Sequence, residues 1–281
     1  MDIIYQPKDM QDWSNAKRQQ GKTIAFVPTM GFLHEGHASL LKEGRKRADE
    51  LVLSIFVNPT QFAQGEDFDV YPRDMERDLD IANQTKVDVV FVPDTQFLYP
   101  KYYQTFVTLN NLPNYLCGKN RPTHFKGVST IVAKLFNMVK PHIALFGQKD
   151  FQQLTIIQQM TYDLNFDIDI IGCPIIREKD GLAMSSRNSY LSKHDRQIAP
   201  CLYQALKTAR NQVASGERDT QKIIAGAKQM IESHPNVVID YISIFNSNTL
   251  DEINTISSSC RMALAVQLGK TRLIDNIELK I

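Results

Sequence analysis

Two histidines three residues apart, His34 and His37, are the side chains whose types and spacing most directly suggest chemistry in this sequence. Glycines Gly31 and Gly36 accompany them, and the group follows an apolar, β-branched run at residues 23–27. If a helix begins here, its first backbone N–H groups are unpaired and its amino-terminal end carries partial positive charge. Two imidazoles one turn apart at such an end suit an anion, above all a phosphate.

Three familiar motifs do not fit this segment. Gly31 and Gly36 have the spacing of a P-loop, but that motif continues with lysine and then serine or threonine. Here the chain continues with His37 and Ala38. The Gly-x-Gly-x-x-Gly fingerprint is absent, and the metalloprotease motif needs histidines four apart rather than three. We favour a phosphate-binding junction of strand, loop and helix in an enzyme that handles a nucleotide; the alternative, that the histidines only cap the helix, remains open.

Polar side chains also follow other apolar runs in the first two-thirds of the chain. Residues 58–62 follow the second run and residues 147–150 the fourth, while Arg177 and residues 184–187 follow the fifth. In an open parallel sheet, ligands bind beyond the carboxyl ends of the strands. We therefore expect these clusters to lie at the same edge of one sheet.

The elements that must position these residues alternate between strand and helix. Apolar runs predict strands over residues 23–27, 51–57, 87–92, 143–146 and 168–171, and helical periodicity predicts helices over 36–48, 73–84, 128–139 and 150–163. Such alternation predicts an α/β fold: a Rossmann-like parallel sheet with helices on both faces.

The pattern changes near residue 176. Two helical stretches, over 196–215 and 220–233, precede alternating strands over 237–244 and 262–267, with a turn signal at 268–270. These patterns predict a smaller α+β domain after the Rossmann-like part. We place the Rossmann-like nucleotide-binding domain over residues 1–175 and the carboxy-terminal α+β domain over 176–281.

Composition restricts the class of partner. The 281 residues carry 32 Lys and Arg against 31 Asp and Glu, a formal net charge of +1. Nucleic-acid binders usually carry a clear basic excess, so this balance favours a small-molecule substrate. The sequence shows no signal-peptide core and no apolar stretch near the roughly 20 residues of a membrane span. Four separated cysteines without a Cys-x-x-Cys pair predict reduced thiols, so we expect a cytoplasmic protein with no membrane partner.

Two segments resemble the motifs of a known superfamily. The sequence from His34 to His37 resembles the His-x-Gly-His motif of nucleotidyltransferases, and Met184-Ser185-Ser186-Arg187 resembles their second, mobile phosphate-binding motif. The longer strings PTMGFLHEGH, SIFVNPTQF, RPTHFKGV, FGQKDFQQL and DGLAMSSRN, in this order, resemble the pantothenate synthetase (pantoate–β-alanine ligase) family.

The resemblance implies an ATP-dependent ligase that joins pantoate to β-alanine. It implies a pantoyl-adenylate intermediate, with release of pyrophosphate and then AMP, and a homodimer. The contacts to ATP that it implies are Met30, Gly31, Phe32, Leu33, His34, Glu35, Gly36, His37, Gly147, Gln148, Lys149, Asp150, Ile176, Met184, Ser185, Ser186 and Arg187.

The same resemblance assigns roles within this set. It makes His37 a proton donor, His34 its helper in binding phosphates, and Lys149 a positive charge near the α-phosphate. It assigns Gln61 and Gln153 to pantoate, and Gln61 also to β-alanine. Neutral amides suit a substrate with hydroxyls and a carboxylate, since they both donate and accept hydrogen bonds. Arg121 and His124 lie in a matching string on the substrate side. A site role and a structural role are equally supported for Asn58, Tyr71 and Arg121.

Two departures from the family pattern concern the nucleotide site. Gln148 stands where the family commonly has glutamate, and we expect little effect because Lys149 and Asp150 follow it. The acidic run associated with Mg²⁺ is thin here, and Asp78 is its candidate ligand. Mg²⁺ is still expected with ATP, because it usually binds through substrate phosphates and few carboxylates.

Two other functions stay open at this stage. A nucleotidyltransferase that moves AMP or CMP onto a phosphate acceptor would share the histidine pair, but it does not account for Gln61, Gln153 and the RPTHF string together. A nucleotide-sensing or RNA-binding module could keep the fold without turnover. The neutral charge balance opposes RNA binding, and the complete set of polar clusters opposes a protein without turnover.

Overall fold

The computed structural model describes residues 1–281, which form two compact units. The first unit comprises Met1–Asn114, Gly118–Gln148 and Gln153–Pro174, and the second comprises Tyr115–Cys117, Lys149–Gln152 and Ile175–Ile281. Two short segments of the second unit therefore come from within the sequence of the first. The predicted domain boundary at residue 175 stays a prediction, because a domain is defined by its ability to fold independently.

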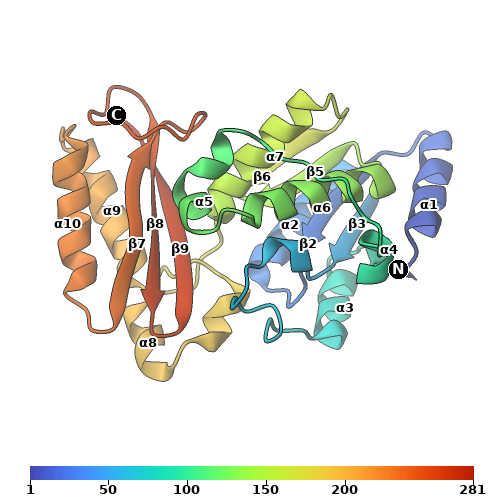
Figure 1. Cartoon of the computed structure of the whole chain (residues 1–281), viewed down its shortest axis with the longest axis horizontal. Coiled ribbons are helices and arrows are strands. Elements are labelled where there is room, and N and C mark those ends of the chain that lie inside the picture. Colours follow the sequence, from blue (N-terminus) through green and yellow to red (C-terminus); the bar gives the residue numbers. More distant parts are fainter. The chain divides into compact units, whose positions relative to one another are not determined.

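A six-stranded parallel sheet forms the centre of the first unit (Figure 1). Its strands are β1 (Asp2–Ile4), β2 (Ile24–Thr29), β3 (Glu50–Ile55), β4 (Val89–Phe91), β5 (Ile143–Gly147) and β6 (Asp169–Cys173). Their order across the sheet is β1-β4-β3-β2-β5-β6, and every neighbouring pair is parallel. Five of these strands were predicted. The edge strand β1 was missed because it has three residues, two of them exposed, and so shows no apolar run.

Helices cover both faces of this sheet. The helices in this part of the chain are α1 (Pro7–Gln19), α2 (Glu35–Arg47), α3 (Met75–Gln84), α4 (Thr95–Leu98), α5 (Leu116–Asn120), α6 (His124–Val139) and α7 (Phe151–Asp163), of which α5 and α7 begin in segments of the second unit. In β2, Ala25 and Val27 pack in one core cluster with Leu41 of α2. Ile24 and Phe26 alternate with them and are equally buried, so they point to the opposite face. This arrangement confirms the predicted fold class.

The strand order contains a switch point between β2 and β5. From β2 the chain continues to β3 and β4 on one side, and it later returns to β5 and β6 on the other. Connections that leave neighbouring strands in opposite directions leave room at the carboxyl ends for a ligand. The loop from Met30 to His34 follows β2, and the 3₁₀ segment η3 (Gln148–Asp150) follows β5. Sequence periodicity therefore correctly placed these polar clusters after adjacent strands.

The second unit has an antiparallel sheet of three strands, β7 (Val237–Phe245), β8 (Cys260–Leu268) and β9 (Thr271–Leu279). Its helices are α8 (Lys193–Ile198), α9 (Cys201–Ala214) and α10 (Thr220–Glu232). The predicted single helix over 196–215 was wrong, because α8 ends and α9 begins around Pro200. Proline has no N–H to donate and its ring clashes with the preceding turn, so it separates the two helices.

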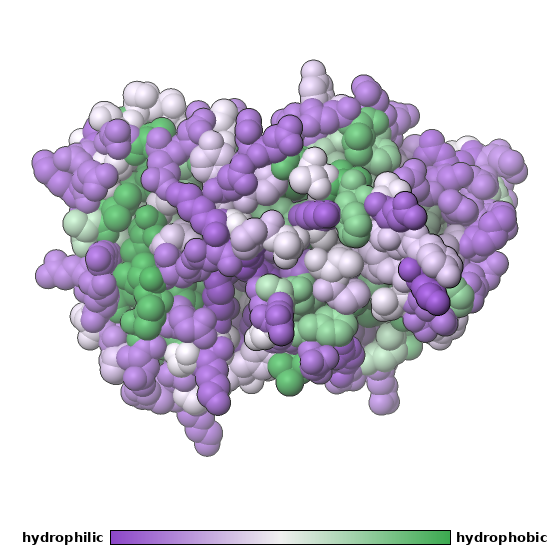
Figure 2. Space-filling model, in the orientation of Figure 1, coloured by the Kyte–Doolittle hydropathy of each residue, from purple (hydrophilic) through white to green (hydrophobic).

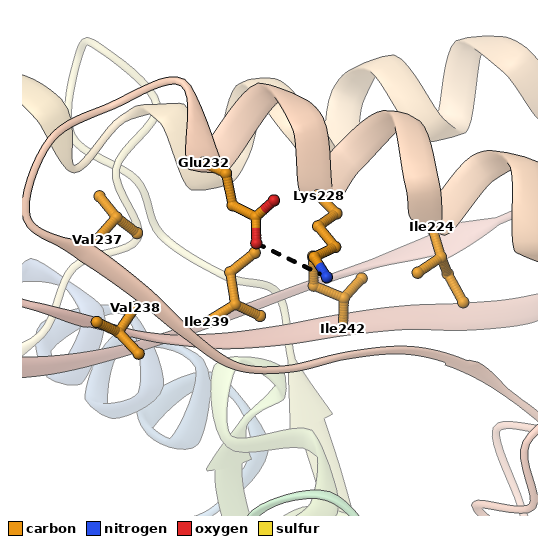
Figure 3. A pocket seen from close by; sticks show the side chains of 7 residues that line it. All are labelled: Ile224, Lys228, Glu232, Val237, Val238, Ile239 and Ile242. Carbon is orange, nitrogen blue, oxygen red and sulfur yellow. Dashed lines mark ion pairs between the residues drawn. The ribbon is translucent and has the colours of Figure 1, made fainter.

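A groove on the second unit lies between α10 and β7 (Figure 3). Its lining combines aliphatic side chains with one ion pair: Ile224, Lys228, Glu232, Val237, Val238, Ile239 and Ile242. Lys228 and Glu232 lie one turn apart on α10 and approach to 3.7 Å. Figure 2 shows a hydrophobic area at the left of the view, where Figure 1 labels α10 and β7. The groove contains no residue of the predicted nucleotide site.

Two further expectations concern the chain as a whole. All four cysteines are buried and free, so the structure contains no disulfide. None of the helices combines the length and the apolar character that crossing a membrane requires.

Glycine packing gives a first testable prediction. A Cβ on Gly127 in α6 would lie 2.3 Å from the Thr60 carbonyl oxygen, whereas a Cβ on Gly226 in α10 would meet nothing closer than 3.6 Å. We expect Gly127→Ala to lower the free energy of unfolding by about 1–3 kcal/mol through overpacking. The matched variant Gly226→Ala should raise it by roughly 0.5–1 kcal/mol, since alanine favours a helix. Urea unfolding followed by circular dichroism measures both, and equal stability of Gly127→Ala and wild type would contradict the close contact.

Candidate functional site

The loop after β2 is held by a single buried carboxylate. The backbone N–H groups of Phe32 and Leu33 donate to the two oxygens of Asp78 at 2.8 and 2.6 Å. Gly31 and Phe32 have φ values of +81° and +50°, a left-handed conformation that glycine tolerates and phenylalanine rarely adopts. A Cβ at Gly31 would lie 2.9 Å from Asp78, so only glycine allows this close approach. Burial raises the pKa of Asp78, while the two backbone donors act in the opposite direction.

The two histidines form the amino-terminal cap of α2. Nδ1 of His34 accepts from the Gly36 N–H at 3.1 Å, and Nδ1 of His37 accepts from the His34 N–H at 3.3 Å. Their ring centroids are 4.1 Å apart. A neutral imidazole that accepts through Nδ1 carries its proton on Nε2. Both rings therefore have a donor at Nε2 even when they are uncharged.

The structure shows the capping role, which uses Nδ1 of both rings. Phosphate binding by the same two side chains stays a prediction. The cap also fixes the direction of both rings, which a ligand site requires.

Gln61 lies in the 3₁₀ turn η1 (Pro59–Gln61), and its amide is oriented by Asn58. Asn58 Nδ2 donates to Gln61 Oε1 at 3.2 Å, and Gln61 Nε2 donates to the Met30 sulfur at 3.0 Å. The Asn58 oxygen accepts from the Tyr99 hydroxyl at 2.9 Å, and its amide also donates to the Gly127 carbonyl at 3.2 Å. Asn58 is 1% exposed, so its amide is buried and satisfied on both sides. The sequence left a structural and a site role equally supported for Asn58, and the structure shows that it holds Gln61.

Arg121 and His124 also contact the backbone of Gln61. Arg121 donates to its carbonyl at 3.3 Å, and His124 Nδ1 lies 2.8 Å from the same oxygen. Arg121 pairs with Glu66, with 2.5 Å between the guanidinium and the carboxylate. Burial on its own would raise the pKa of Glu66, but the hydrogen bond and charge of Arg121 hold it below its usual value. The RPTHF string thus supports the predicted pantoate residue.

The remaining predicted residues of the first unit lie at the end of β5, at the start of α7 and around the start of α2. Gly147 ends β5, and Gln148 follows it in η3, where its amide donates to the Gly172 carbonyl of β6 at 3.2 Å. Gln153 lies in the first turn of α7 and is half-buried. Leu33 has a fully buried side chain, so any ligand contact there would come from its backbone. Glu35 is exposed and pairs with Lys42 at 3.5 Å.

Lys149 and Asp150 belong to the second unit. The Lys149 ammonium lies 3.9 Å from the Asp150 carboxylate, and the Lys149 carbonyl accepts from Asn276 of β9 at 2.9 Å. The Lys149 side chain is 18% exposed and that of Asp150 is 50% exposed. Lys149 is therefore held at its backbone, while part of its side chain reaches solvent.

The segment Met184-Ser185-Ser186-Arg187 follows a short β-ladder at the start of the second unit. Arg177 pairs with Ala183 in an antiparallel bridge, and the Met184 N–H donates to the Ile176 carbonyl at 3.0 Å. Ser185 then caps the 3₁₀ helix η4 (Ser186–Tyr190), accepting from the Arg187 N–H at 3.3 Å. Ile176 and Met184, both predicted contacts to ATP, are therefore neighbours.

A buried ion pair fixes the base of this segment. The two terminal nitrogens of the Arg177 guanidinium donate to Asp275 of β9, at 2.6 and 2.9 Å. Burial raises the pKa of Asp275, while the hydrogen bonds and charge of Arg177 lower it. Arg177 also stacks on the Tyr203 ring, 4.0 Å from its centroid. Sequence reasoning missed Asp275 and Asn276, although two adjacent polar residues between the apolar residues Ile274 and Ile277 could have indicated them.

The predicted metal site has no ligand cluster on the chain. No group of three or more His, Cys, Asp or Glu side chains is arranged to hold a metal ion. Both oxygens of Asp78 accept backbone N–H groups instead. Coordination of Mg²⁺ by Asp78 stays a prediction, and the structure gives this carboxylate a different role in shaping the loop.

Comparison with known proteins agrees along the whole chain. The family described as pantoate-beta-alanine ligase matches residues 2–278. The pantothenate synthetase of Desulfatibacillum aliphaticivorans is 54% identical over 276 residues, covering 98% of both chains. That of Syntrophus aciditrophicus (strain SB) is 52% identical over 276 residues, covering 98% of this chain and 96% of the relative.

Solved structures give the same result. The crystal structure of pantothenate synthetase from Thermus thermophilus is similar over 100% of both chains, with a TM-score of 0.95 and 37% identity. The pantoate-beta-alanine ligase of Francisella tularensis, complexed with beta-gamma ATP and beta-alanine, has a TM-score of 0.81 and 34% identity and covers 99% of this chain and 97% of its own. The chain therefore belongs to the pantoate–β-alanine ligase family, the pantothenate synthetases.

Proposed function

We propose that this enzyme joins pantoate to β-alanine in two steps through an adenylate. In the first step, a carboxylate oxygen of pantoate forms a bond to the α-phosphorus of ATP, and the bond from that phosphorus to the bridging oxygen breaks, releasing pyrophosphate. In the second step, the amine nitrogen of β-alanine attacks the activated carbonyl carbon. The carbon–oxygen bond to AMP then breaks, the amine loses a proton, and pantothenate and AMP leave.

The histidine cap is the observation that carries this proposal. Phosphoryl transfer depends mainly on positioning and on stabilising charge at the phosphate oxygens. His34 and His37 each hold an Nε2 donor at the amino-terminal end of α2, where the helix dipole also favours an anion. In our proposal His37 donates to the phosphate oxygens as charge develops on them, and His34 assists it.

Other positive charges among the proposed contacts would act on the same phosphates. Lys149 supplies an ammonium near the α-phosphate, and Arg187 with Ser185 and Ser186 acts on the outer phosphates. Lysine acts as a compact charge, and arginine binds phosphate oxygens with two nitrogens. Together they favour departure of pyrophosphate.

Pantoate recognition is proposed for Gln61 and Gln153. Asn58 donates to Gln61 Oε1, and one amide hydrogen of Gln61 is directed at the Met30 sulfur, so we assign the second amide hydrogen to pantoate. An N–H donor suits the carboxylate or hydroxyl oxygens of pantoate. A complex of ATP analogue and β-alanine with the Francisella relative supports the choice of these two cosubstrates for this chain.

Three expectations remain predictions. Mg²⁺ is expected to accompany ATP and to be held mainly by phosphate oxygens, since the chain offers no ligand cluster of its own. The homodimer and the cytoplasmic location rest on the family resemblance and on the composition.

Replacing His37 tests the proposed activity. We expect wild type to form AMP and pantothenate from ATP, pantoate and β-alanine. His37→Ala should lower kcat about a hundredfold or more, because one charge-assisted contact in the transition state is lost. His194→Ala, at an exposed histidine of α8, is the matched control and should retain wild-type rates.

The same assay separates the competing functions. Pantoate-dependent exchange of pyrophosphate into ATP supports the ligase. Exchange that requires a phosphorylated acceptor instead would support another nucleotidyltransferase, and nucleotide binding without AMP formation would support a sensing module. Either of these two results would overturn the proposal.

Replacing Asp78 distinguishes a loop anchor from a metal ligand. The amide of Asp78→Asn has one acceptor oxygen, so one of the two loop N–H groups loses its partner. We expect the free energy of unfolding to fall by about 1–3 kcal/mol and the KM for ATP to rise, at an unchanged Mg²⁺ requirement. Asp80 lies two residues further along and is exposed, so Asp80→Asn is the matched control. It should leave the free energy of unfolding, the KM for ATP and the Mg²⁺ requirement unchanged. A raised Mg²⁺ requirement at saturating ATP, with wild-type stability, would instead identify Asp78 as the ligand.

A further inference from the structure

Asn276 of β9 connects the antiparallel sheet of the second unit to the lysine proposed for the α-phosphate. Its side-chain amide donates to the Lys149 carbonyl at 2.9 Å. Only 2% of Asn276 is exposed, and the neighbouring Asp275 is 3% exposed. A buried polar side chain is costly unless it is hydrogen-bonded. The contacts of Asn276 therefore define what it does.

The direction of the Asn276 amide is fixed by Arg261 of β8. A guanidinium nitrogen of Arg261 donates to Asn276 Oδ1 at 2.6 Å. A guanidinium has donors only, so the atom facing it must be the amide oxygen. The amide nitrogen is consequently directed at the Lys149 carbonyl. Arg261 thus acts on Lys149 through Asn276.

The same arginine holds the residue that begins α7. The Arg261 guanidinium lies 4.0 Å from the centroid of the Phe151 ring. Because Arg261 is only 8% exposed, this stacking is shielded from water. Cation–π contacts are strongest when water is excluded. The segment Lys149–Gln152 is therefore held at Lys149 by β9 and at Phe151 by β8.

Asp275 adds a second link from β9. It binds the Arg177 guanidinium at the base of the Met184–Arg187 segment, and the charge of Lys149 also acts on its carboxylate. Asp275 and Asn276, consecutive residues of β9, thus hold the two segments of the second unit that contain predicted phosphate contacts. These segments are Lys149–Gln152 and Met184–Arg187.

Resting on the proposed function, we infer that Asn276 is a positioning residue for adenylation, which fixes the backbone of Lys149 so that its ammonium lies at the reacting phosphate. The Lys149 side chain is flexible and partly exposed, so its reach depends on where its backbone is held. A displacement of about 1 Å in a reacting group can slow catalysis roughly a hundredfold. Asn276 itself touches no substrate in this role.

The test is Asn276→Asp in the full-length chain. This isosteric change keeps an acceptor for Arg261 but replaces the donor to the Lys149 carbonyl with an oxygen. We expect kcat of pantoate-dependent pyrophosphate exchange to fall about 10- to 100-fold. The KM for pantoate should not change, because its proposed contacts lie in the first unit. Asn248→Asp, at an exposed asparagine, is the matched control and should keep wild-type values.

A double-mutant cycle separates positioning from a general structural effect. If Asn276 acts through Lys149, Asn276→Asp in a Lys149→Ala background should slow exchange no further. Independent, multiplicative losses would overturn the inference, as would a parallel rise in the KM for pantoate.

Arg261→Met provides a second variant that adds no negative charge near Lys149. Methionine keeps an apolar contact to Phe151 but no longer orients the Asn276 amide. We expect a smaller fall in exchange kcat, again absent in the Lys149→Ala background. If Asn276→Asp does not fold, as judged by circular dichroism, this variant decides alone, and wild-type exchange in it would overturn the inference. Absence of exchange in wild type would overturn the proposed function instead, so the two failures are distinguishable.

Discussion

The carboxylate of Asp78 determines the shape of the loop on which the candidate site depends. Two consecutive N–H groups, from Phe32 and Leu33, point at its two oxygens because the backbone turns left-handed at Gly31 and Phe32. This turn brings the chain from the end of β2 directly into the first turn of α2. Without an acceptor inside the turn, two buried donors would lack partners, a state that folded proteins avoid. The histidine cap begins immediately after this turn, so its direction follows from it.

The sequence allowed the architecture, and the position of polar clusters after the strands, to be predicted because both follow from periodicity. Strands buried on both faces have continuous apolar runs, and α6 has an apolar stripe at helical spacing, so these elements were identified without tertiary information. The rule that ligands bind beyond the carboxyl ends of parallel strands then indicated the polar clusters after β2, β3, β5 and β6. The strand β1 and the break at Pro200 were not anticipated: β1 is too short for a pattern, and Pro200 lies in a stretch whose apolar spacing continues past it.

The partners of the site residues could not be predicted, because they depend on contacts far apart in sequence. Asn58 and Gln61 are close neighbours, and their pairing was within reach of local reasoning. Asp78 lies 45 residues from Leu33, and Asn276 lies 127 residues from Lys149. Nothing in the type or spacing of such residues identifies the pair. The family resemblance supplied the residues proposed to meet the substrates, but it gave neither Asn276 nor the role of Asp78 in holding the loop.

The placement of Lys149–Gln152 in the second unit has a consequence for the order in which the chain folds during synthesis. The segment is made before β8 and β9, yet its partners Arg261 and Asn276 lie more than 100 residues later. A chain emerging from its amino terminus could form the parallel sheet while this segment still lacks its partners. Contacts that close such long loops form slowly. We therefore expect β8 and β9 to be the last elements to pack around Lys149. A truncated chain ending near residue 174 would contain the lysine but not the strand that holds it.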